Sequence, residues 1–134
     1  MSLPSWFRTR KAHREASPRL NGLVVSVVDY MRSHPSVEAF FPQVVAVALH
    51  DTELAVLTAF GELDDAGIVK PRYGTYCKIS STPINVYDTL AEVPTEETCP
   101  DCACAVSFQD ESMYVDLYFV VDRVALAQWR RSAA

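Results

Sequence analysis

Residues 45–69 read VAVALHDTELAVLTAFGELDDAGIV, and this stretch decides the fold. The segment 43–49 is short and apolar, and Asp51 after it is a residue type that favours a helix N-cap. Apolar residues then recur every three positions, which predicts a second helix over 52–66. Gly67 provides the stop signal for that helix, and extended chain follows it. The recurring apolar residues, which we expect to face the core, are Leu54, Leu57, Phe60 and Leu63.

A longer amphipathic helix precedes this stretch, over residues 19–33. Its apolar residues are spaced by three and four, as one face of a helix requires. Pro35 ends the helix, and Pro42 suits the first position of the next one. We expect a turn or a short helical stub over 36–41. The apolar face consists of Leu20, Leu23, Val24, Val27, Val28 and Met31.

The helix, turn, helix and Gly-Ile-Val ending together resemble the core of a winged helix-turn-helix domain, over residues 20–80. In that family the second helix has the form L-x-x-L-x-x-x-G-I-V and leads into a β-hairpin wing; Phe60 stands here at the first leucine position. The resemblance implies three short helices around one small core. It also implies a wing over 70–77, with turn residues between Pro71 and Gly74.

The four cysteines are the second informative feature. Cys99 and Cys102 have the spacing of a metal-binding knuckle, in which two thiolates reach one ion across a tight turn. Cys77 lacks such a partner, because Ser80 stands where the second cysteine is expected. The 18 residues between Ser80 and Cys99 match the spacing of a zinc ribbon. The pattern therefore resembles a zinc ribbon in which one ligand is missing.

Two interpretations of these cysteines remain open. In the first, zinc is bound by Cys77, Cys99, Cys102 and Cys104, or by three of them with His34 or His50. In the second, the ribbon has lost its metal and its cysteines pack as small apolar residues. A catalytic thiolate is disfavoured, since no histidine lies near the cysteines in the sequence.

The C-terminal part is predicted to be rich in β-structure. Residues 105–109 and 114–121 have the composition of strands, with a turn over 110–112 between them. Asp122 is a suitable N-cap for a last helix over 123–131. We expect the polar segment 93–98 to be a loop.

The fold class that follows is α+β. A winged-helix core of three helices with a β-hairpin wing precedes a zinc-ribbon-like β hairpin and a C-terminal strand and helix. The predicted domain organisation is a basic arm over 1–19, a winged-helix-like domain over 20–80 and a zinc-ribbon-like element over 81–134.

Charge is unevenly distributed along the chain, whose formal net charge is −5. The segment 1–19 has one acidic residue, Glu15, against five basic ones. One interpretation of this arm is a solvated terminus that packs Trp6 and Phe7 onto the rest of the protein. The other is an arm that binds nucleic acid or an acidic partner. Its basic residues are Arg8, Arg10, Lys11, Arg14 and Arg19.

The helix over 52–66 is acidic and contains no Arg, Lys, Asn or Gln, the residues that commonly read DNA bases. We therefore predict a non-enzymatic interaction or adaptor subunit of a regulatory or defence complex, with another protein as partner. The predicted contact residues are Glu53, Thr58, Glu62, Lys70, Arg72 and Tyr73. The alternative is a transcriptional regulator that binds DNA phosphates without sequence specificity, through Arg8, Arg10, Lys11, Arg14 and Arg72.

Other classes of protein are disfavoured. No run of 18 apolar residues is present, and no apolar segment follows the basic N-terminus. We therefore expect a cytoplasmic protein that does not associate with membranes, either alone or as a homodimer. We expect no enzymatic activity, because the histidines lie outside any catalytic motif and the glycines form no phosphate-binding loop.

Overall fold

The computed structural model describes residues 18–130, and these residues form two compact units. One unit consists of residues 18–70 and 119–130, and the other of residues 71–118. The chain passes from one unit to the other within strands β2 (Val69–Cys77) and β6 (Met113–Val121). Helices and antiparallel strands are both present, which confirms the α+β class. The units divide the chain after residues 70 and 118, whereas the sequence places a boundary after residue 80.

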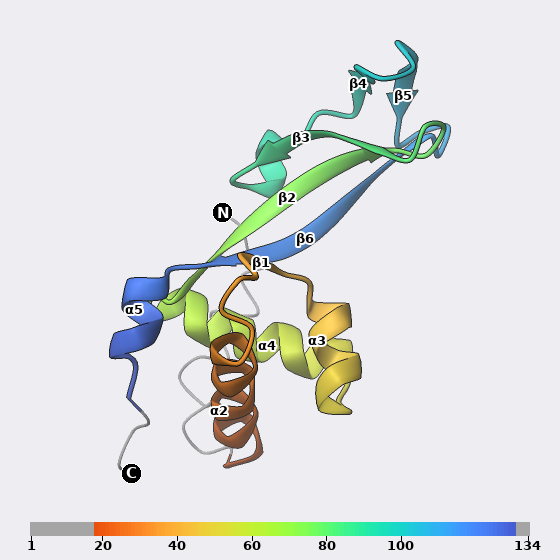
Figure 1. Cartoon of the computed structure of the whole chain (residues 1–134). Helices are drawn as coiled ribbons and strands as arrows, with labels where there is room; N and C mark the ends of the chain where they lie inside the picture. The colour runs from red at the N-terminus through yellow and green to blue at the C-terminus, as the bar shows by residue number, and fades with distance from the viewer. Residues whose placement is uncertain (1–17, 131–134) are drawn as a thin grey trace. The chain divides into compact units, whose positions relative to one another are not determined.

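Four α-helices belong to the unit of residues 18–70 and 119–130 (Figure 1). They are α2 (Pro18–Arg32), α3 (Pro42–Leu49), α4 (Glu53–Asp65) and α5 (Arg123–Gln128). Pro42 begins α3 as predicted, and Gly67 has a φ of 78°, a conformation that glycine adopts without strain. The predicted N-cap of α4 is wrong by one residue. Thr52 is the cap and accepts a hydrogen bond from the Ala55 amide at 3.1 Å, whereas Asp51 accepts one from the Thr52 amide.

The core of this unit lies between α2, α3 and α4. The rings of Phe60 and Phe119 stack inside it, with centroids 4.7 Å apart. Leu54, predicted to face the core, is instead 62% exposed, because it lies in the first turn of α4, before the buried face begins at Val56. The buried residues of the three helices are Leu23, Val27, Val28, Met31, Pro42, Val45, Ala46, Val56, Ala59, Phe60, Gly61 and Leu63.

Two arginines tie the last helix of this unit to the first. Arg32, at the end of α2, donates to the carbonyl oxygens of Leu126 and Trp129 at 2.8 and 3.0 Å. Arg123, at the start of α5, donates to the carbonyl oxygen of Met31 at 2.9 Å. Each guanidinium therefore satisfies carbonyl groups at the end of the other helix.

The strands form one sheet of four, in the order β1-β6-β2-β3, and one of two, β4-β5. Strands β1 (Ala39–Phe40) and β4 (Glu96–Thr98) occupy segments where the sequence predicts a turn or stub and a loop. Both strands are short and each pairs along one edge only. Strands of two or three residues are too short for an alternation of apolar and polar residues to be detected in the sequence. The other strands are β3 (Thr82–Tyr87) and β5 (Ala105–Ser107), and a 3₁₀ turn, η2, covers Leu90–Glu92.

The predicted wing tip is also wrong. Pro71 and Gly74 lie inside β2, and the chain turns only at 78–81, between β2 and β3. Alternate residues of β2 are buried, a period of two that a turn would interrupt. Pro71 and Gly74 were therefore misleading as turn signals, because a proline is tolerated in a strand where its N–H is not needed.

Within residues 18–130, no single helix combines the length and apolar content needed to cross a membrane. Helices α3 and α4 meet that criterion only as a pair, and the chain bends by 113° between them.

We predict that Thr52→Ala lowers the free energy of unfolding by about 1 kcal/mol, because the first turn of α4 loses its side-chain cap. Thr58→Ala is the matched control. The Thr58 hydroxyl donates within α4 to the Leu54 carbonyl at 2.9 Å, and alanine favours a helix interior, so this variant should be as stable as the wild type. Urea unfolding followed by circular dichroism measures both. Equal stability of the two variants would contradict the assignment of Thr52 as the cap.

Candidate metal centre

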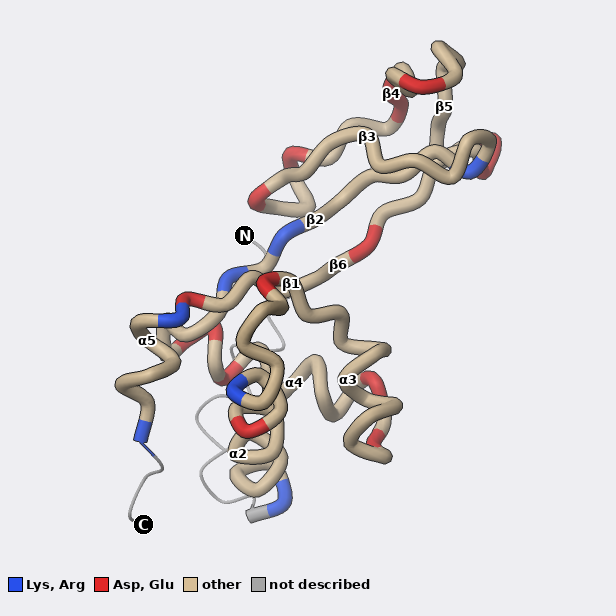
Figure 2. The backbone as a smooth tube through the Cα atoms, viewed as in Figure 1, with Lys and Arg blue, Asp and Glu red and all other residues tan. Residues whose placement is uncertain are grey.

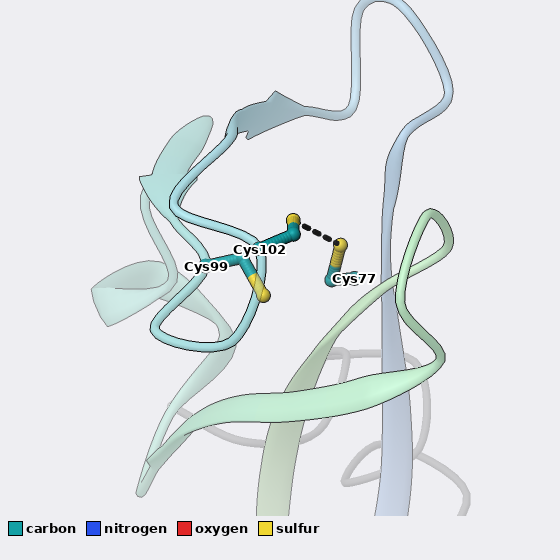
Figure 3. Close-up of side chains that lie close together, drawn as sticks. All are labelled: Cys77, Cys99 and Cys102. Carbon is teal, nitrogen blue, oxygen red and sulfur yellow. Dashed lines mark hydrogen bonds between the residues drawn. The ribbon is translucent and has the colours of Figure 1, made fainter.

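Two hairpin turns of the unit 71–118 bring three cysteines together (Figure 3). Cys77 ends β2 and begins the turn to β3, while Cys99 and Cys102 lie in the turn between β4 and β5. The sulfur atoms of all three lie within 4.8 Å of one another, and those of Cys77 and Cys102 are 3.8 Å apart. The structure thus brings together three of the four predicted ligands, in a group that can hold a metal ion.

The two turns share features of backbone geometry. The Ser80 amide donates to the sulfur of Cys77 at 3.5 Å, across the same spacing that separates Cys99 from Cys102. The residue after each pair has a positive φ of 58°, at Ser81 and at Ala103. Ser80 therefore occupies in the first turn the position that Cys102 occupies in the second, as the sequence spacing predicts.

Two hydroxyl groups complete the surroundings of Cys99. The Ser80 Oγ and the Thr82 Oγ1 lie 3.3 and 3.5 Å from its sulfur. Their hydrogen bonds, together with backbone amides, lower the pKa of Cys99 to about 6. The thiolate that a metal requires is therefore the favoured form of Cys99 at neutral pH. The hydrogen bond with Cys104 is the main cause that raises the pKa of Cys102 to about 12, so a metal would have to displace its proton.

The three clustered cysteines also lie in the core of the unit 71–118. Cys77 and Cys99 are fully buried together with Val106 and Met113. Ile84, Cys102 and Cys104 pack against them, partly buried. The cluster therefore excludes water on most sides. This burial suits both a structural metal, which takes its ligands from the protein, and the alternative of a packed apolar core.

The predicted fourth ligand is not in place. The Cys104 sulfur lies outside the group of three and donates to the carbonyl oxygen of Cys102 at 3.5 Å. His34 and His50 belong to the other unit, and neither is part of the group of potential ligands found among the described residues. The Ser80 Oγ lies 3.3 Å from the sulfur of Cys99, beside the group of three.

The predicted contact residues differ in accessibility. Glu53 and Lys70 are exposed, while Thr58 and Glu62 are half-buried. Arg72 is half-buried and forms an ion pair with Asp88. Tyr73 is only 4% exposed, because it belongs to the buried side of β2, so its side chain offers no contact surface and that prediction is wrong. The predicted phosphate contacts Arg8, Arg10, Lys11 and Arg14 lie outside the described residues.

A half-buried carboxylate, that of Glu97, connects β4 to β3 next to the cysteine turn. Glu97 accepts hydrogen bonds from the Tyr87 hydroxyl at 2.5 Å and from the Asn85 amide at 2.7 Å. Burial alone would raise the pKa of Glu97, but hydrogen bonds with Thr75, Tyr87 and Asn85 outweigh it and hold this pKa below its ordinary value. No feature of the sequence indicated this network.

We predict that Glu97→Gln destabilises the protein at pH 7 by about 1 kcal/mol, because the charge-assisted hydrogen bonds are lost. A carboxyl whose pKa is depressed on folding stabilises the folded state above its unfolded pKa, and this contribution is lost as the pH falls through the folded value. The difference between the wild type and the variant should therefore begin to shrink near the ordinary pKa of 4.5 and vanish only below the folded pKa, which is lower. Thermal melts at pH 7 and pH 3.5 measure it. A difference that persists unchanged in acid would contradict this role.

A scan against protein-family models, a search of curated proteins and a search of solved structures each found no match to the chain.

Proposed function

We propose that the chain is a non-enzymatic protein-interaction module, an adaptor subunit built on a winged-helix arrangement. Three observations support it. Helices α2 and α3 both pack against α4, α4 is followed by the Gly-Ile-Val segment and a strand, and that strand continues into the hairpin β2-β3. The order of elements is the one that the winged-helix resemblance implies.

The observation that carries the proposal is the exposure of three large apolar side chains, two on α3 and one in the first turn of α4. Val47 is 76% exposed, Leu54 62% and Val44 56%. Val44 and Val47 are three residues apart on α3 and therefore lie on one face of it, while Val45 and Ala46 are buried on the other side. Exposed apolar side chains that gather on neighbouring elements mark sites of protein association. We name Val44, Val47 and Leu54 the α3 surface.

The charges in the described residues favour a protein partner over DNA. Helix α4 presents Glu53 and further acidic residues, and DNA phosphates would be repelled by them. The predicted phosphate contact Arg72 is already ion-paired with Asp88. A DNA-binding role would therefore depend on the basic arm over 1–19.

We predict that Val47→Glu weakens binding to the partner about tenfold or more, since a charge would enter an apolar contact. Gln128→Glu is the matched control, because it adds the same charge at an exposed polar position of α5, outside the α3 surface. Tagged wild type and both variants would be purified from the native cells and the retained protein quantified, with folding checked by circular dichroism. We expect a partner to be retained by the wild type and Gln128→Glu and lost with Val47→Glu.

The DNA alternative makes the opposite prediction. It requires that the protein bind DNA at micromolar concentration and that this affinity fall steeply as the salt concentration rises. The Val47→Glu variant should bind DNA with unchanged affinity. Fluorescence anisotropy with a labelled duplex tests this, and such a result would overturn the interaction proposal.

We further propose that the three thiols bind zinc in a structural role. Two thiolates that bind one tetrahedral zinc ion at about 2.3 Å lie about 3.8 Å apart. The sulfur atoms of Cys77 and Cys102 are separated by 3.8 Å. The fourth position would be taken by Ser80, by a water molecule or by Cys104 after rotation of its side chain. All four cysteines are free thiols, which suits the cytoplasm, the compartment we propose.

We predict about one zinc ion per chain when the protein is purified without chelator. Cys99→Ser should abolish zinc binding and loosen residues 71–118, because a structural zinc site contributes directly to folding. Cys104→Ser removes a thiol outside the group of three and should retain the metal; loss of zinc in this variant would show that Cys104 is the fourth ligand. Elemental analysis and a thiol assay measure both. Absence of zinc together with four reactive thiols would show that the cluster is a metal-free core.

A further inference from the structure

Three tyrosines gather around one carboxylate on a single face of the unit 71–118. Side chains of a strand alternate between its two faces, so Tyr114, Asp116 and Tyr118 of β6 share one face. The rings of Tyr76 and Tyr114 stack with centroids 5.1 Å apart and an angle of 15° between them. Burial raises the pKa of Tyr76, and the nearby charges of Asp116 and of both other tyrosines raise it further. We name Tyr76, Tyr114, Asp116 and Tyr118 the tyrosine face.

Gly74 makes this arrangement possible. A Cβ atom at Gly74 would lie 3.2 Å from a ring carbon of Tyr76 and 3.4 Å from one of Tyr118. Both rings therefore lie over the backbone of β2 at this point, in the space that a side chain would occupy. The glycine predicted as a turn residue thus has another function, which is to let two aromatic rings meet above the strand.

The tyrosine face is accessible, in contrast to the opposite side of the same strands. Tyr114 is 37% exposed, and Tyr76, Asp116 and Tyr118 are half-buried. On the opposite side, Thr75 is fully buried. Within the described part of the chain, no lysine or arginine forms an ion pair with Asp116. The tyrosine face therefore combines aromatic rings with a negative charge that no described cation neutralises.

The charge of the whole unit determines which ligand this face attracts. Residues 71–118 contain eight acidic residues and only two basic ones, Arg72 and Lys78, and the acidic positions are distributed along β4, β6 and the turns (Figure 2). Arg72 is neutralised by Asp88. Such a surface repels nucleic acid and a second copy of itself, and it attracts a cation.

We propose that the tyrosine face binds a lysine or arginine side chain in a basic segment of a partner protein. A cation above an aromatic ring is attracted by the negative face of the ring, and Asp116 would pair with the same cation. The inference rests on the proposed function as an interaction module, but it uses a surface separate from the α3 surface. It adds the chemistry of the partner, which must present a basic side chain.

The test uses the purified full-length chain and a fluorescein-labelled peptide in which arginine and lysine alternate with serine. A second peptide, with glutamine in place of every cation, is the reference. Asp116→Asn should weaken binding of the basic peptide about fivefold to tenfold, from loss of the pairing charge. Glu96→Gln is its matched control: it removes one exposed charge from β4 of the same unit, outside the tyrosine face, and should change the affinity less than about twofold.

The aromatic part of the proposal has its own pair of variants. Tyr114→Leu should weaken binding about fivefold, because the ring is lost, whereas Tyr114→Phe retains the ring face and should bind as the wild type does. Circular dichroism confirms that each variant is folded. Equal losses in Asp116→Asn and Glu96→Gln would show attraction by net charge alone, and tight binding of the glutamine peptide would show a contact that needs no cation. Either result overturns the proposal.

The outcome is independent of the α3 surface. The peptide measurement needs no native partner and no apolar contact on α3. Val47→Glu should therefore bind the basic peptide as the wild type does. If it loses the native partner while its peptide binding is intact, both surfaces contribute separately. If the peptide binds to none of the proteins, the tyrosine face has no such ligand, although the α3 surface can still bind a partner.

Discussion

The contact between the two cysteine turns is the constraint on which residues 71–118 depend. The hairpin β2-β3 pairs with β6, whereas β4-β5 is a separate sheet of two strands. The fully buried residues that join them are few: Cys77, Cys99, Val106 and Met113. Units with so small a core are commonly stabilised by a metal or a disulfide. The sulfur atoms of Cys77 and Cys102 lie 3.8 Å apart without a covalent bond, which agrees with the metal that we propose. Glu97 adds a second link through Asn85 and Tyr87.

The helical unit does not need such a link. Helices α2, α3 and α4 bury a set of apolar residues, and the stacked Phe60 and Phe119 lie in the interior of the unit. Arg32 and Arg123 link α5 to α2. The two units are therefore stabilised by different means. Loss of a bound metal would destabilise residues 71–118 first, whereas a cavity at Phe60 would destabilise the helical unit.

The sequence predicted the features that depend on spacing, and missed those that depend on neighbours in space. A period of three to four marked α2 and α4, and the spacing of Cys77, Ser80, Cys99 and Cys102 indicated the two equivalent turns. Residue type alone misled at Pro71, Gly74 and Tyr73, because they lie in a strand between β3 and β6, and β6 is far along the chain. Asp51 and Thr52 are both good caps by type, and only the geometry separates them. The tyrosine face left one signal, the alternation of Tyr114, Asp116 and Tyr118.

Cys77 and Met113 of the buried cluster lie on β2 and β6, the same strands that carry the tyrosine face, and this couples the two features physically. Tyr76 immediately precedes Cys77, and Tyr114 immediately follows Met113, so each strand places one residue in the buried cluster and the next on the opposite face. The stacking of Tyr76 on Tyr114 therefore requires that Cys77 and Met113 stay packed beneath them. A metal that fixes Cys77 would also fix the relative position of these two rings. A metal bound there would need to perform no chemistry of its own: it would hold the proposed aromatic and acidic binding surface in a single geometry before a partner arrives.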